Sequence, residues 1–279
     1  MFARRTRLLA LSPFLVLSLA RQCDPPPPPP PELWVFCGVD AEAPDAETRT
    51  AALAASGATS TLGRCKLPSG PYTPATTADR YTSRHGYGLL VGLNARHGMT
   101  TVVYDPGVWS DDPAERAAAL DYWRPVLPSI RAWDMGDEFD PAGPEWATLV
   151  HRWNVVLEHV TPVTGVRPFT SHLPERYGSL DAAVRDLPGA ADLLAFNDYD
   201  LTSAIATAAR WAPRAKLMCS INGYGMTGLS TTAEKIAGDT RALRPYCAAI
   251  LLFGGEPVAG GPDFVPVPDW APAIHGATR

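Results

Sequence analysis

Short apolar segments alternate with longer amphipathic, alanine-rich segments along most of this 279-residue chain. The short segments are roughly five to eight residues long and apolar on both faces, which is typical of parallel strands buried on both sides. The eight predicted strands are Leu33–Val39, Ala58–Cys65, Thr100–Tyr104, Ile130–Met135, Gly165–Thr170, Asp192–Asn197, Lys216–Ile221 and Cys247–Phe253. Their regular alternation with helices predicts repeated βα units and a parallel sheet.

Seven helical segments are predicted between these strands. They are Asp45–Ser56, Ala78–His97 (interrupted by glycines), Pro113–Tyr122, Pro144–Val160, Ser179–Asp186, Thr202–Arg210 and Thr231–Leu243. Together the elements predict one α/β domain over residues 33–279, a (β/α)8 TIM barrel whose final helix, within Pro257–Arg279, is short or irregular. A doubly wound open sheet is the alternative, but no glycine-rich GxGxxG turn follows the first strand.

The N-terminus predicts export. Arg4, Arg5 and Arg7 precede an apolar stretch that ends in Ser18-Leu19-Ala20, so we expect residues 1–20 to be a signal peptide. An uncleaved membrane anchor is the alternative. Residues 21–32 are predicted to be a linker, because the seven prolines from 25 to 31 favour an extended rod. The chain is therefore expected to be secreted or held at the cell surface.

Two further properties of the sequence limit the classes of binding partner that we expect. The net charge is −5 without a basic run, which argues against nucleic acid. Lipidation of Cys23 would supply a membrane tether, although Gln22 departs from the small residue that usually precedes a lipidated cysteine. The cysteines form neither a CxxC pair nor a zinc-type cluster with histidine, so we expect no metal and no cofactor. Disulfides are expected instead between neighbouring strands, at Cys37–Cys65 and secondarily at Cys219–Cys247.

Polar residues follow most of the predicted strands, at the end where a barrel carries its active site. We expect Asp134 and Asp140, near the end of the fourth strand, to be solvated or to cap turns. Asp105, after the third strand, belongs to the same strand-end set. The residues expected to bind a substrate are Asp40, Tyr104, Trp109, His172, Asn197, Tyr199, Asn222 and Tyr224. Aromatic faces among carboxylates and amides suit a sugar, which presents C–H groups and hydroxyls together.

The fourth strand runs directly into Gly136-Asp137-Glu138. At this point the chain resembles the retaining (β/α)8-barrel glycoside hydrolases, in which the fourth strand ends in Asn-Glu or a related pair. In those families the glutamate is the general acid/base. The resemblance covers the order of the barrel elements and this one motif, with Asp137 in place of Asn. It implies that Glu138 protonates the leaving oxygen and that Asp137 holds the sugar or Glu138.

One departure from that family leaves two functions open. Its nucleophilic glutamate follows the seventh strand, where this chain reads Asn222-Gly223-Tyr224-Gly225 without a carboxylate. The second carboxylate would then be Glu256 or Asp198. We therefore expect a hydrolase that acts on a polysaccharide or oligosaccharide. The alternative is a non-catalytic barrel that binds glycan or cell wall and has lost the nucleophile.

Overall fold

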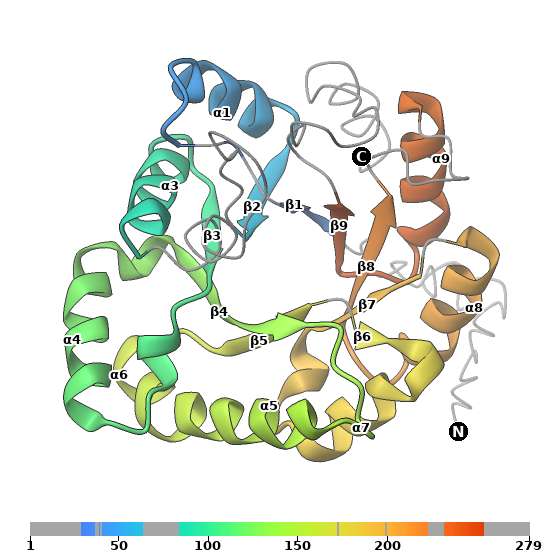
Figure 1. Ribbon diagram of the computed structural model, residues 1–279. Helices are drawn as coiled ribbons and strands as arrows, with labels where there is room; N and C mark the ends of the chain where they lie inside the picture. Colours follow the sequence, from blue (N-terminus) through green and yellow to red (C-terminus); the bar gives the residue numbers. More distant parts are fainter. Residues whose placement is uncertain are drawn as a thin grey trace, which may run out of the picture.

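The computed structural model describes residues 29–36, 39, 41–63, 84–171, 173–198, 200–222 and 232–253 (Figure 1). Its parallel strands form a nearly closed barrel in the order β5-β4-β3-β2-β1-β9-β8-β7-β6. The strands are β1 (Glu32–Phe36), β2 (Ala58–Leu62), β3 (Thr100–Val103), β4 (Ile130–Asp137), β5 (Pro168–Ser171), β6 (Leu173–Pro174), β7 (Leu194–Asn197), β8 (Leu217–Asn222) and β9 (Ala249–Phe253). Each of the eight predicted strands overlaps one of these, so the predicted (β/α)8 barrel is confirmed.

The unpredicted ninth strand explains how the barrel closes. β5 pairs with β4, whereas β6 pairs with β7, and only residue 172 separates the two segments in the sequence. The fifth strand of the barrel is therefore split. Its first part completes one side of the sheet, and its second part continues to the other side.

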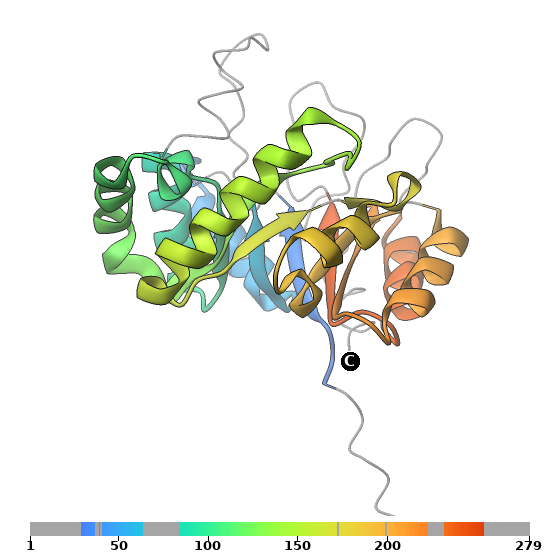
Figure 2. The same cartoon turned by 90° about the horizontal axis from the view of Figure 1, so that it is seen from below.

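Helices surround the barrel as an outer layer (Figures 1 and 2). They are α1 (Ala46–Ala55), α3 (Arg84–Arg96), α4 (Pro113–Trp123), α5 (Pro144–Val155), α6 (Thr161–Thr164), α7 (Ser179–Asp186), α8 (Leu201–Trp211) and α9 (Ala233–Leu243). One turn of π-helix, Val156–Val160, joins α5 to α6, so the long helix predicted from Pro144 to Val160 is largely present. The segment of the expected closing helix, residues 257–279, lies outside the described residues.

Helix α3 is continuous where its glycines predicted interruption. A Cβ on Gly88 would lie 2.5 Å from the Tyr122 hydroxyl, so α3 and α4 approach closely only because position 88 has no side chain. The same hydroxyl donates to the Arg84 carbonyl at 3.3 Å. Glycine here serves helix–helix contact rather than a break in the helix.

Two apolar layers form the core. One fills the barrel with side chains from eight strands: Trp34, Leu62, Val102, Ala132, Phe169, Ala195, Met218, Ala249 and Leu251. The other lies between barrel and helices and includes Trp123, Trp133 and Trp211, all fully buried. Because strand residues alternate between faces, the first set identifies which neighbours point toward the barrel axis.

A disulfide joins Cys219 of β8 to Cys247 beside β9, with 6.0 Å between the two Cα atoms. This is the second pair that the strand order predicted. Cys37 and Cys65, the pair expected first, lie outside the described residues. The cross-link closes a loop of 28 residues that contains all of α9.

Removing this disulfide is expected to lower stability. Cys219→Ser with Cys247→Ser should reduce the free energy of unfolding by about 3 kcal/mol, because the unfolded chain regains the entropy of the open loop. Urea denaturation of the variant and the oxidised parent measures the difference. Equal midpoints would show that the cross-link contributes nothing to stability.

Helices long and apolar enough to span a membrane are absent from the described part of the chain. The chain enters the barrel at Pro29–Glu32, at the end where the strands begin (Figure 2). The predicted signal peptide and most of the predicted linker lie outside the described residues.

Candidate active site

A bulge at the end of β4 builds the candidate site. Asp134 pairs with Phe169 of β5, but Asp137 pairs with Ser171, so β4 has one residue more than its partner. Ala132 fills the barrel, and Asp134, two residues later, points to the same side. The extra residue brings Asp137 back to that side as well. The bulge therefore directs two carboxylates, three positions apart, toward the mouth of the barrel.

Gly136 allows the backbone conformation that the bulge requires. Its φ is +109°, a conformation that residues with a side chain rarely adopt, and a Cβ there would lie 3.0 Å from the Phe139 ring. Thr170 of β5 donates to the Gly136 carbonyl at 2.8 Å. Ser179 of α7 donates to the Phe139 carbonyl at 3.0 Å. Two neighbouring elements thus fix both ends of the turn that carries Asp137 and Glu138.

Glu138 has the only left-handed backbone among non-glycine residues in the described part of the chain, with φ +54°. Such a conformation costs free energy and is concentrated at functional sites. Its exposed side chain accepts a hydrogen bond from Asn197 Nδ2 at 3.4 Å. Asn197 ends β7, on the far side of the split fifth strand. The structure therefore brings together two residues that the sequence predicted for the site.

Of the residues that the structure describes, Asp134 has a strongly raised pKa. Its side chain keeps partial contact with solvent, yet burial against the barrel interior raises its pKa to about 7. The Gly136 amide, which donates to Oδ1 at 3.1 Å, opposes this shift, and the charge of Asp137 adds to it. Asp134 caps the turn through this contact and keeps partial solvent contact, as expected, and its raised pKa is a further property of the mouth. The alternation Ala132-x-Asp134 was the signal for its inward direction.

Asp137 and Tyr104 lie in the same electrostatic environment. Burial and then the charge of Glu138 raise the pKa of Asp137. Burial also raises the pKa of the Tyr104 hydroxyl, Arg152 opposes the shift, and the charges of Asp134 and Asp137 add to it. These couplings place Tyr104 near both aspartates. Mutual repulsion at such a mouth favours the uptake of a proton.

Trp109 supports Tyr104 rather than offering an open face. Only 5% of its surface is exposed, and its ring meets Tyr104 edge-on with centroids 5.2 Å apart. Trp133 of β4 is fully buried and packs edge-on against Trp123 in the helix layer, with 6.2 Å between the ring centroids. Trp133 therefore faces away from the carboxylates.

Two other acidic residues stabilise turns. Asp198 accepts a hydrogen bond from the Asp200 amide at 3.1 Å, and Asp140 accepts one from the Ala142 amide at 2.9 Å. Asn222 is the last residue of β8, the neighbour of β7. The remaining candidates lie outside the described residues: Asp40, His172, Tyr199, Tyr224 and Glu256.

Asp105, which also follows a strand, has a purely structural environment. It is 4% exposed and accepts both Arg84 Nε at 2.7 Å and Arg84 Nη2 at 3.0 Å. The Trp123 indole donates to it at 2.7 Å and the Gly107 amide at 3.0 Å. Four donors thus consume its acceptor capacity, and it ties α3 and α4 to the end of β3.

As for cation sites, the described ranges contain no group of three or more histidine, cysteine, aspartate or glutamate residues able to hold a metal ion.

Comparison with known proteins agrees with the fold. No protein-family model and no curated protein matches the sequence. Tryptophan synthase from M. tuberculosis superposes with TM-score 0.51 at 14% identity, covering 90% of this chain and 93% of that one. A Bacteroides thetaiotaomicron protein named as a proposed alpha-L-fucosidase has TM-score 0.51 at 11% identity, covering 90% and 91%. At such identities the likeness shows a TIM-barrel fold alone, which many activities share.

The unusual state of Asp134 predicts a pH-dependent gain of stability in Asp134→Asn. A carboxyl whose pKa is higher in the folded than in the unfolded state destabilises the fold as pH rises from about 4 to about 7. Asparagine mimics the protonated form, so the variant should exceed the parent by about 2 kcal/mol at pH 8, allowing for solvent contact. The gain should vanish at pH 4.

Urea denaturation across this pH range measures the effect. Asp121→Asn is a suitable control, since that side chain is 68% exposed on α4. A gain that is the same at every pH would contradict the assigned titration.

Proposed function

We propose that this barrel hydrolyses a glycosidic bond with Glu138 as its general acid. The observation that carries the proposal is the constrained turn after β4, in which a left-handed Glu138 is held by Asn197 of β7. A general acid must deliver its proton to one particular oxygen in the transition state, which requires a fixed carboxyl at the place of bond cleavage. The location at the C-terminal ends of the strands is where such barrels carry catalysis.

The surrounding residues supply the remaining functions in this proposal. Asp137, next to Glu138, binds a sugar hydroxyl. Tyr104, held by Trp109, forms part of the sugar-binding surface. Asp134 provides a carboxyl that exchanges protons near neutral pH. Glu256 stays the proposed second carboxylate, because Asp198 is engaged in its own turn. The similarity to a protein named as a proposed alpha-L-fucosidase is compatible with this chemistry.

The engagement of Asp198 also favours a second candidate function, a barrel that binds glycan without cleaving it. A panel of nitrophenyl glycosides and cell-wall polysaccharides separates the two. Product release from at least one substrate supports hydrolysis, whereas retarded migration in a polysaccharide gel without product supports binding alone. If no member of the panel is cleaved and none is bound, both candidate functions are contradicted.

A further inference from the structure

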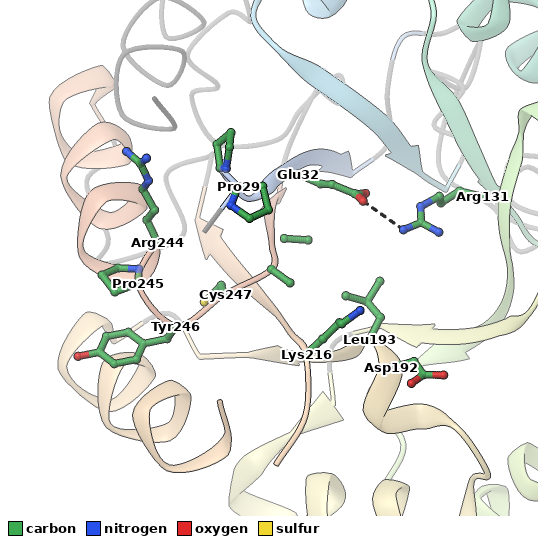
Figure 3. Close-up of a pocket in the computed structure, with 13 residues that line it drawn as sticks. Pro29, Glu32, Arg131, Asp192, Leu193, Lys216, Arg244, Pro245, Tyr246 and Cys247 are labelled. Atoms are coloured by element: carbon green, nitrogen blue, oxygen red, sulfur yellow. Dashed lines mark hydrogen bonds and ion pairs between the residues drawn. The ribbon is translucent and has the colours of Figure 1, made fainter. Parts of the chain in front are cut away.

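A cavity of about 660 Å³ opens at the opposite end of the barrel from Glu138. Its walls come from residues at the starts of the strands and from the chain that leads into β1 (Figure 3). Pro29, Leu193, Pro245 and Tyr246 supply apolar wall. The volume lies within the usual range of about 300–1,000 Å³ for sites that bind small molecules.

The charges of the cavity do not balance. Its two acidic residues are each paired with an arginine: Glu32 with Arg131 at 3.2 Å, and Asp192 with Arg167. Its other two basic residues, Lys216 and Arg244, form no ion pair with any described residue. In Figure 3 the Lys216 amine lies beside Leu193, and Arg244 lies on the opposite side of the cavity, beside α9. Counting the described residues alone, the cavity therefore has two positive charges without an ion-pair partner, in a protein whose net charge is −5.

We propose that this cavity is a second binding site, selective for a small molecule with one anionic group, a phosphate or a carboxylate. An ammonium and a guanidinium on the walls of one cavity can each recognise such groups through charge-assisted hydrogen bonds. The apolar wall would accommodate the rest of the ligand. The site is independent of the proposed hydrolysis, because its residues lie at the other end of the strands.

Titration of the full mature chain with two probes tests the proposal. Inorganic phosphate and D-glucuronate are titrated separately by calorimetry at pH 7 and low ionic strength. We expect millimolar binding of at least one probe, weakened about tenfold or more in Lys216→Ala and in Arg244→Ala and abolished in the double variant. Stronger binding of phosphate would identify a phosphorylated ligand, and stronger binding of glucuronate an acidic sugar.

Controls separate this site from surface charge and from the mouth. Arg241→Ala removes an equal charge from the same C-terminal part of α9 without touching the cavity, and should bind as the parent does. Amide chemical shifts of the parent on titration should change around Leu193 and Lys216, a measurement that needs no variant. If neither probe binds at 50 mM, or if binding survives the double variant, the proposal is overturned.

Discussion

Glu138→Gln is expected to reduce turnover of a natural glycan at least 10²-fold, the usual size of a general-acid contribution. Glutamine keeps the shape of the side chain and can still contact Asn197, so ligand affinity should change little. The alkoxide leaving group of a natural glycosidic bond is poor, and without the proton its departure becomes slow. On aryl glycosides with activated phenolate leaving groups the loss should be much smaller, because those groups need little protonation.

The dependence on leaving group makes this experiment specific. A variant damaged in folding or in sugar binding would lose activity on both classes of substrate equally. Glu145→Gln, on the exposed first turn of α5, is the matched control and should retain the parent rate. A Glu138→Gln enzyme that cleaves the natural substrate at the parent rate would exclude Glu138 as the acid.

Asp105→Ala is expected to have the largest effect on stability, a loss of about 3–5 kcal/mol. The substitution leaves Arg84, the Trp123 indole and the Gly107 amide without their acceptor in a site that is 4% exposed at Asp105. The cost arises from the buried Trp123 indole and Gly107 amide, which lose their acceptor, and from the partly exposed Arg84 guanidinium, which loses its counter-charge. Denaturation in urea measures it directly.

A second variant distinguishes charge from shape. Asp105→Ala combined with Arg84→Met removes both charges and should recover a substantial part of the loss. Asp112→Ala serves as the control, because Asp112 caps α4 through Ala114 in an exposed position and should cost only about 1 kcal/mol. A loss below 1 kcal/mol for Asp105→Ala would show that water replaces the carboxylate without penalty.

Asp105 and Asp134 show what the sequence could and could not predict. Both follow or end an apolar strand, so periodicity places both at the mouth end of the barrel. What separates their roles is Arg84, which lies 21 residues before Asp105 and reaches it only after α3 packs on the barrel. Among the described residues, no cation lowers the pKa of Asp134 in this way. Long-range packing decides which aspartate gains an arginine partner. The residue pattern of a strand carries no information about that packing.

The barrel itself was predictable because its strands and helices are encoded in local residue patterns. Its strands are buried on both faces and its helices on one, so each segment carries its own local signature in the residue pattern. The helix boundaries at Pro113 and Pro144 follow from proline in the first turn, and the structure has them there. The bulge at Gly136 and the split of the fifth strand leave no comparable pattern, because they arise from register between neighbouring strands.

The entry of the chain at the start of β1 fixes how the barrel can be oriented on a support. Every strand runs from that end toward the carboxylates, so an attachment through residues ahead of Pro29 leaves the mouth at the opposite pole. A protein immobilised in this way presents Glu138 and Asn197 outward, where a long polymer can reach them without passing the support. A bulky fusion joined directly ahead of Pro29 would instead lie at the end that carries the Lys216 and Arg244 cavity, so a purification tag placed there concerns one end of the molecule and spares the other.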